Sequence, residues 1–311
     1  MIVLLSILIA VLFLILERSI GIGWDFHPDA STYVNTSSII FEGIVGDARK
    51  LLNNGHYLVV YLMGSNVGVL TGLNILIYSI TNHVIYSQIR KKTVVDSALF
   101  YIAILLYIFN PYRLHLAVSI LKDTVIIFLL AVLICYRGKI FSFSLMFIYR
   151  FAALLYLPLL IKKDRIFIYI LFGSVLFILV YPLIRGHILE VSMVDMQFRD
   201  FDRVSSFREM SEIGAIVRAM VWPVITLTGY FVFMSPALYF VPLAVGSLVI
   251  LLVSVKISAG EYWLFVIPLL IMSLFSLLVT GYTSYYRYIF PVLTLIPLYI
   301  ARLKSGEAEY D

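Results

Sequence analysis

Long apolar runs recur from one end of the chain to the other and determine its predicted architecture. They cover residues 2–16, 65–89, 95–110, 114–136, 166–184, 237–255, 261–280 and 286–301. Each run has roughly the length that an α-helix needs to cross ~30 Å of hydrocarbon. The alternating short strands of a transmembrane barrel are not seen. The pattern therefore predicts an all-α, polytopic transmembrane helical bundle.

Two further segments break the simple count of crossings. Residues 140–161 carry basic clusters at both ends, so a single crossing would place one cluster outside. We expect a re-entrant pair of half-helices bent near Arg150, with the bend buried in protein or lining a wet cavity. Residues 213–235 pose the same problem, and Pro223 would kink or break a helix there, so we expect interfacial or half-inserted helices. The alternative is that both segments cross. The total is about 8–10 membrane helices.

Two long loops join the predicted spans, one at about 17–56 and one at about 185–212. In the first loop, apolar residues recur at helical spacing opposite a polar face, which predicts an amphipathic juxtamembrane helix on the outer interface. These residues are Tyr33, Ile40, Phe41, Ile44, Val45, Ala48, Leu51 and Leu52. The second loop is rich in charge. We expect a single integral membrane domain over residues 1–311.

Composition supports this picture and gives it an orientation. The 311 residues are 62% hydrophobic and 13% charged, too little polar surface for a soluble domain of this length. Basic clusters after the spans belong in the cytoplasm, which places both termini inside and the 17–56 loop outside. Residues 2–16 lack the basic start and cleavage site of a signal peptide, so we expect a retained helix. The charge of +5 follows from topology and indicates no nucleic-acid partner.

The lone cysteine and the absence of a P-loop exclude other chemistry. Cys135 excludes an intramolecular disulfide and a cysteine metal site. The inner loops are too short for a nucleotide-binding fold, so ATP is not expected to drive this chain.

Ionisable residues inside predicted spans are candidates for function, because they are costly in a bilayer. Lys122 and Asp123 lie in "HLAVSILKDTVIIFLL", and adjacent residues on a helix do not face each other. The alternatives are a local ion pair or a lysine that extends to the interface. Arg150, at the predicted bend, suits a phosphate or pyrophosphate, which it could bind at two points. It could equally bond to exposed carbonyls.

Three further residues are candidates at the outer ends of spans. Arg287 follows "GYTSYY" and could bind an anionic group or anchor the span among tyrosines. Arg113 and His115 begin the span at 114–136 and are weaker candidates.

The stretch "GWDFHPDASTYV", residues 23–34, places two acids directly after the first span. Pro28 suits the first turn of a helix, and Asp29 suits its positive N-terminus. That explanation does not cover Asp25, which would be partly desolvated beside the membrane and suited to act as a general base. The pair could instead bind a divalent cation, and the sequence leaves the metal unknown. His27 is expected to be a local hydrogen-bond partner.

The arrangement resembles the C-type (GT-C) membrane glycosyltransferases. That family places its catalytic acid just after the first span, followed by amphipathic helices, as in "WDFHPDASTYV" and residues 33–52. It has a short helical pair near the middle, as in "SFSLMFIYRFAALLYLPLLI", and an arginine before a late proline-containing span, as in "YYRYIFPV". "SILKDTVIIFLL" is similar to the Ser-x-x-(Arg/Lys)-Asp stretch of bacterial O-antigen polymerase-like proteins. Residues 1–311 show no stretch that we expect to form the large C-terminal soluble domain of some members.

The resemblance implies transfer of a sugar or sugar chain from an undecaprenyl (pyro)phosphate donor to a saccharide acceptor. Asp25 or Asp29 would take the acceptor proton, and Lys122, Arg150 and Arg287 would stabilise the departing phosphate. It implies a bacterial cytoplasmic membrane, an active site facing the exterior, and polysaccharide-assembly proteins as partners. No organic cofactor is implied, and a divalent cation stays open.

Two other classes of function compete with this reading. A flippase or other transporter of lipid-linked saccharide would show paired repeats and discontinuous helices in both halves. The sequence has one re-entrant candidate and no matching partner. A non-enzymatic scaffold in an export complex is the third possibility.

Overall fold

The described part of the chain is helical and contains long apolar helices. A computed structural model describes residues 1–93, 97–136, 139–160, 172–180, 212–234, 240–278 and 282–306, with no strand among them. In this part, four helical segments are long and apolar enough to cross a membrane: Ile2–Ser19, Val67–Lys91, Ala98–Val118 and Phe240–Ser258. The third consists of two helices in succession, Ala98–Ile108 and Pro111–Val118. The four segments indicate a membrane protein. The number of crossings, their orientation and the single membrane domain stay predictions.

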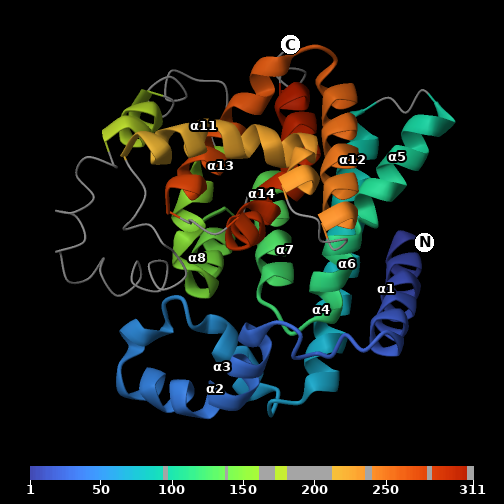
Figure 1. Cartoon of the computed structure of the whole chain (residues 1–311). Coiled ribbons are helices and arrows are strands. Elements are labelled where there is room, and N and C mark those ends of the chain that lie inside the picture. Colours follow the sequence, from blue (N-terminus) through green and yellow to red (C-terminus); the bar gives the residue numbers. More distant parts are fainter. Residues whose placement is uncertain are drawn as a thin grey trace. The chain divides into compact units, whose positions relative to one another are not determined.

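The chain divides into two compact units, Met1–Leu154 and Leu155–Asp311. The helices of the first unit are α1 (Ile2–Ser19), α2 (Pro28–Gly46), η1 (Ala48–Leu51), α3 (Gly55–Leu62), α4 (Val67–Lys92), α5 (Ala98–Ile108), α6 (Pro111–Val118), α7 (Asp123–Cys135) and α8 (Lys139–Tyr149) (Figure 1). The 3-10 helix η2 (Phe151–Leu160) begins in this unit and continues into the second.

Helix α1 exposes apolar residues and buries polar ones, which is the reverse of a helix on the surface of a soluble protein. Leu4, Leu8, Leu12 and Leu16 form an outward stripe, each between 54% and 73% exposed. Ser6, Ala10 and Glu17 are buried on the face towards the unit. The small residues let α1 approach α4 closely, and Asn82 Nδ2 of α4 donates to Ser6 Oγ at 3.0 Å. Small and polar residues inside with apolar residues outside are typical of a helix in lipid.

Side-chain caps start three of these helices where the sequence supplies Asn or Ser. Asn66 accepts from the amide of Val69, and Ser97 from that of Phe100. Asn110 caps α6 by accepting from Tyr112 N at 2.9 Å, with Pro111 as the first helical residue. Each cap satisfies amides that the first turn leaves without helical partners.

The largest departure from the predicted elements is a break in the span expected at 114–136. Helix α6 ends at Val118 and α7 begins at Asp123. Asn74 of α4 donates to the carbonyls of Ser119 at 2.7 Å and Leu121 at 3.3 Å. Thr124 Oγ1 donates to Leu116 O at 2.9 Å across the break. The continuous span was therefore a wrong prediction, because a partner on another helix satisfies the freed carbonyls.

The first loop folds into a helical pair that packs on α8. Helix α2 and α3 lie side by side (Figure 1), and Phe41 stacks on Tyr61 with ring centroids 4.0 Å apart. Gly55 starts α3 where a Cβ atom would lie 3.3 Å from Ile148 O of α8, so this approach needs glycine. The amphipathic segment predicted from residue 33 is therefore α2, which begins earlier, followed by η1.

The second unit is built around α14 (Tyr282–Gly306), which is buried almost continuously from Ile289 to Ala301. Its other described elements are a helix at 172–180, α11 (Glu212–Thr228), η4 (Tyr230–Met234), α12 (Phe240–Ser258), η5 (Tyr262–Phe265) and α13 (Val266–Leu278). Helix α11 packs on α13, and α12 on α14. At one end, Lys304 Nζ of α14 donates to Ser258 O at 3.0 Å and lies 3.4 Å from Glu261.

The predictions for the segments at 213–235, 140–161 and 166–212 have different outcomes. Pro223 lies inside α11, which continues to Thr228, so the proline does not break the helix. The helix ends at Gly229, where φ is +71° and a Cβ atom would lie 2.8 Å from Ala244 O. Helix α8 ends at Tyr149 and η2 follows Arg150, so the chain changes conformation at the predicted bend. That this pair is re-entrant stays a prediction. Of the loop at 185–212, all but the last residue, Glu212, lies outside the described residues, as do both ends of the span at 166–184.

Asn74 offers a test of the broken helix. Replacing Asn74 with Ala leaves two buried carbonyls without this donor, which costs about 1–3 kcal/mol. We expect a lower Tm in detergent, measured by intrinsic fluorescence, than for Asn35→Ala on the exposed face of α2. Equal Tm values for the two variants would contradict the role given to Asn74.

Candidate functional site

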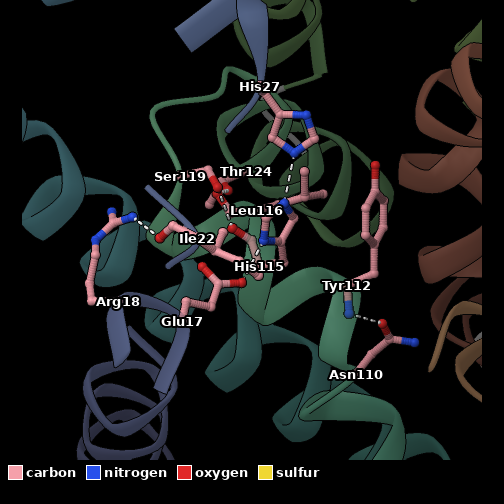
Figure 2. A network of polar contacts seen from close by, with 10 residues as sticks. All are labelled: Glu17, Arg18, Ile22, His27, Asn110, Tyr112, His115, Leu116, Ser119 and Thr124. Atoms are coloured by element: carbon pink, nitrogen blue, oxygen red, sulfur yellow. Dashed lines mark hydrogen bonds and ion pairs between the residues drawn. The ribbon is translucent and has the colours of Figure 1, made fainter. Parts of the chain in front are cut away.

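Three ionisable side chains from separate segments of the first unit form a continuous hydrogen-bonded row. His115 Nδ1 lies 2.6 Å from Glu17 Oε1, and His115 Nε2 lies 2.7 Å from His27 Nε2 (Figure 2). Glu17 and His115 are buried, and His27 is half-buried. We call Glu17, His115 and His27 the relay. A carboxylate–imidazole–imidazole row is suited to holding and moving a proton.

Local structure explains how these three residues meet. Glu17 continues the inward face of α1, eleven residues after Ser6 and seven after Ala10, and these spacings return to the same side of a helix. His27 occupies the N-cap position of α2, just before Pro28. The ring of Phe26 lies edge-on to both imidazoles, with centroids 5.3 Å from His27 and 5.7 Å from His115.

A buried ion pair forms the second polar group of this unit. Arg150 Nη2 donates to Asp123 Oδ1 at 2.5 Å, and the two side chains are 4% and 0% exposed. Asp123 is the first residue of α7, and Arg150 follows the last residue of α8. Lys122 is half-buried at the N-cap of α7, beside the pair. Asp123 thus pairs with Arg150 across two helices, as expected if adjacent residues do not face each other.

The ion pair and the relay lie in the same part of the first unit, because a hydrogen bond joins the two sides of the break between them. His115 precedes Leu116, Asp123 precedes Thr124, and Thr124 bonds to Leu116 O. Standard backbone dimensions then limit the Cα atoms of His115 and Asp123 to about 15 Å apart. Figure 2 shows Thr124 and Ser119 next to the relay. An imidazole pair and a buried guanidinium therefore share one region of the first unit.

Aromatic contacts bring α2 and α3 to the same region. The ring of His56 on α3 lies 4.6 Å from Tyr33 of α2 and 6.1 Å from Tyr149, the residue before Arg150. Asp29 lies one helical turn before Tyr33 and is half-buried. Its position in the first turn of α2 is the one that the sequence predicts.

The remaining candidates have different surroundings. Asp25 is exposed, so protein packing does not supply the desolvation that was expected for it. Arg113 is buried and donates to Asn82 Oδ1 at 2.7 Å and Ile108 O at 3.2 Å. Its guanidinium lies 5.3 Å from the ring centroid of Tyr78, so it connects α6 to α4. Arg287 is half-buried near the start of α14, in the second unit.

Sequence reasoning missed Glu17 and Arg218. Glu17 was assigned to the loop, although the helical spacing of Ser6, Ala10 and Glu17 would have placed it on the inner face of the first span. Arg218 is buried in α11, with its guanidinium 5.0 Å from the ring centroid of Trp222. The four-residue spacing of Arg218 and Trp222 is the signal that could have indicated this contact.

Comparisons with protein families, with curated proteins and with solved structures find no match to the chain. In the described residues, no group of three or more His, Cys, Asp or Glu side chains is placed to hold a metal ion. The divalent cation stays open.

The buried ion pair predicts an asymmetric response to mutation. Asp123→Asn leaves the Arg150 charge buried without its carboxylate, and we expect a loss of about 3–5 kcal/mol in the free energy of unfolding. The double variant Asp123→Leu/Arg150→Met removes both charges and recovers most of that loss. Reversible unfolding in mixed micelles measures both values. Equal losses for the single and double variants would contradict a charge pair.

Proposed function

We propose that the chain is a membrane glycosyltransferase that uses a polyprenyl (pyro)phosphate-linked saccharide as donor. The proposal places its site at the outer face of a bacterial cytoplasmic membrane, in assembly of O-antigen or another surface polysaccharide. The observation that supports it best is the proximity of a buried guanidinium, Arg150, to a row of proton-accepting groups, the relay. Transfer of a sugar from a phosphate needs both kinds of group.

The cationic part of the proposed site is Arg150 with Lys122. The hydrogen bond that Arg150 donates to Asp123 Oδ1 fixes the orientation of the guanidinium, which has five N–H donors in a planar fork. A fixed, buried cation stabilises the charge that develops on a departing phosphate without having to reorganise. Lys122 adds a second positive charge at the half-buried end of α7.

The proton-accepting part lies in the segment from Asp25 to Asp29, directly after α1. In the proposed reaction, the acceptor hydroxyl loses its proton to a group in this segment while its oxygen attacks the anomeric carbon. Asp29 is favoured over Asp25 as the carboxylate candidate by its partial burial and by its position one turn from Tyr33. This reverses the preference that the sequence alone suggests.

The polyprenyl chain of the donor would lie against the apolar exterior. The outward leucine stripe of α1 is one lipid-facing surface in the same unit as the proposed site. A membrane-bound donor would reach the site by lateral diffusion, with its phosphate at the level of the helix ends. The sugar, the linkage and the number of residues added per event are outside this proposal.

A transporter of the same lipid-linked saccharide is the second candidate, and one observation favours it. The chain divides into two units of similar length, Met1–Leu154 and Leu155–Asp311, as many transporters do. Reconstitution separates the two functions. An enzyme yields a new glycosidic product on the side that its site faces, whereas a transporter moves intact donor across the vesicle membrane.

Reconstituted protein supplied with a synthetic polyprenyl-pyrophosphate saccharide and an acceptor should form a new glycosidic bond, detected by mass spectrometry with and without chelator. Movement of unchanged donor across the vesicle membrane, with no product, would contradict the enzyme proposal and support the transporter.

Lys122 offers a quantitative test of the phosphate site. Lys122→Ala removes a charge-assisted contact worth about 1.5–3 kcal/mol, so we expect KM for the lipid-linked donor to rise about tenfold or more. Lys91→Ala, which removes an exposed charge near the end of α4, is the matched control. An equal KM in both variants would remove Lys122 from the site.

Arg150→Lys keeps the charge and loses the planar fork. We expect kcat to fall at least tenfold with Tm close to that of the unmodified protein. An unchanged kcat would show that Arg150 has only a structural role.

A further inference from the structure

We infer that a cavity at the end of α4 binds the phosphate group of an anionic phospholipid. The cavity measures about 310 Å³ and is lined by Met1, Tyr86, Arg90, Tyr101 and Ile104. All five residues belong to the first unit and come from the start of α1, the end of α4 and the first half of α5. The inference goes beyond the proposed function and does not depend on it, because it requires only that these helices lie in lipid.

Helical spacing explains how the polar groups of the cavity meet. Tyr86 and Arg90 are four residues apart near the end of α4, so their side chains lie on the same face of that helix. Tyr101 and Ile104 are three residues apart on α5 and also share a face. The hydroxyl of Tyr101 interacts with the hydroxyl of Tyr86 and with the charge of Arg90. A guanidinium and two phenol hydroxyls from two helices therefore line one cavity.

These polar groups are suited to an anion with several oxygens. The guanidinium of Arg90 has N–H donors in a planar fork that matches two oxygens of a phosphate. Two hydroxyls that bond to each other leave one O–H proton for a further acceptor. In the part of the chain that the structure describes, no carboxylate forms an ion pair with Arg90. The volume is at the lower end of the roughly 300–1,000 Å³ typical of small-molecule sites, which suits a headgroup.

Apolar surfaces on two of the three helices favour a lipid over a free phosphate ion. On α5, Leu99, Ile102 and Leu106 recur at helical spacing and are between 50% and 79% exposed. On α1, the outward leucine stripe begins with Leu4, three residues after Met1. A phospholipid would place its phosphate in the cavity and its acyl chains along these outward faces. A free phosphate ion could use only the polar groups.

The cavity lies at the end of α1 opposite the relay. Met1 and Glu17 are sixteen residues apart, which corresponds to about 24 Å along a helix and is close to the thickness of the hydrocarbon layer. The basic run at 90–92 belongs in the cytoplasm by the positive-inside rule. Anionic lipids give the cytoplasmic leaflet a negative surface potential. The bound lipid would therefore belong to the inner leaflet, whereas the proposed transferase site faces outwards.

Headgroup charge predicts which phospholipids bind. Phosphatidylglycerol and phosphatidylcholine both carry a phosphodiester, but choline adds a quaternary ammonium to the headgroup. Arg90 and its neighbour Lys91 would repel that second charge. Phosphatidylglycerol carries hydroxyls in the same place and keeps its net negative charge. The cavity should therefore prefer phosphatidylglycerol.

Native mass spectrometry of the full chain in detergent micelles tests this preference. Dioleoyl-phosphatidylglycerol should bind about tenfold or more tightly than dioleoyl-phosphatidylcholine, and Arg90→Gln should weaken its binding about tenfold by removing a charge-assisted contact. The matched control is Lys91→Gln, which removes the same charge from an exposed neighbour that does not line the cavity. It should leave the affinity for phosphatidylglycerol almost unchanged. Equal losses in the two variants would overturn the cavity as the binding site and indicate a diffuse basic surface.

Tyr101→Phe tests the cavity without changing charge. It keeps the aromatic ring and removes one hydroxyl, so we expect about threefold to tenfold weaker binding of phosphatidylglycerol. The Tm measured without added lipid should stay close to that of the unmodified protein, because Tyr101 lies at the surface of α5. An unchanged affinity would overturn the part assigned to the tyrosine hydroxyls, even if Arg90→Gln failed to fold.

Inorganic phosphate distinguishes a lipid from a soluble anion. Phosphatidylglycerol should raise the Tm of the unmodified protein in micelles more than that of Arg90→Gln, because a ligand stabilises the folded state that binds it. Inorganic phosphate at constant ionic strength should leave both values unchanged, since it lacks acyl chains. A Tm rise with inorganic phosphate that equals the rise with lipid and requires Arg90 would overturn the lipid assignment. None of these measurements uses transferase activity.

Discussion

The amide of Asn74 is the contact on which the rest of the first unit depends. It satisfies the carbonyls of Ser119 and Leu121 and so allows a helix to stop and restart inside an apolar bundle. In a continuous helix Asp123 would be an interior residue, with its amide bonded to the carbonyl of Ser119. The break turns Asp123 into a helix-starting residue that meets Arg150 from α8. The neutral side chain of Asn74 thus stabilises the break that allows Asp123 to pair with Arg150 in the same part of the unit as the relay.

The two polar groups solve the problem of burial in different ways. Asp123 and Arg150 cancel each other's charge, so their pair holds α7 to α8 and fixes the guanidinium. The relay instead joins three ionisable groups in a row, so its buried members, Glu17 and His115, are hydrogen-bonded to each other. Arg113 belongs to neither kind, because its hydrogen bonds and its contact with Tyr78 go to neutral partners.

Hydropathy predicted the long helices well, because apolar length is a local property. Helices α4 and α12 begin and end within about three residues of the expected limits. Pro28 and Asp29 also occupy the predicted first turn of α2. The break after Val118 was missed because no Gly or Pro marks it, and its cause lies 45 residues earlier in Asn74. Glu17 and His115 are 98 residues apart, and that contact follows only from packing.

Helix α1 presents leucines to its surroundings and Glu17 to the core, and the Ser6–Asn82 bond helps fix its register. In a bilayer, the hydrophobic length of α1 then determines the depth at which Glu17 meets His115. A sliding movement of one turn, about 5.4 Å, would separate the carboxylate from the imidazole. The match between the hydrophobic length of α1 and the thickness of the surrounding lipid therefore affects whether the Glu17–His115 contact can form. The membrane in which this protein lies is in that sense one of the components of its site.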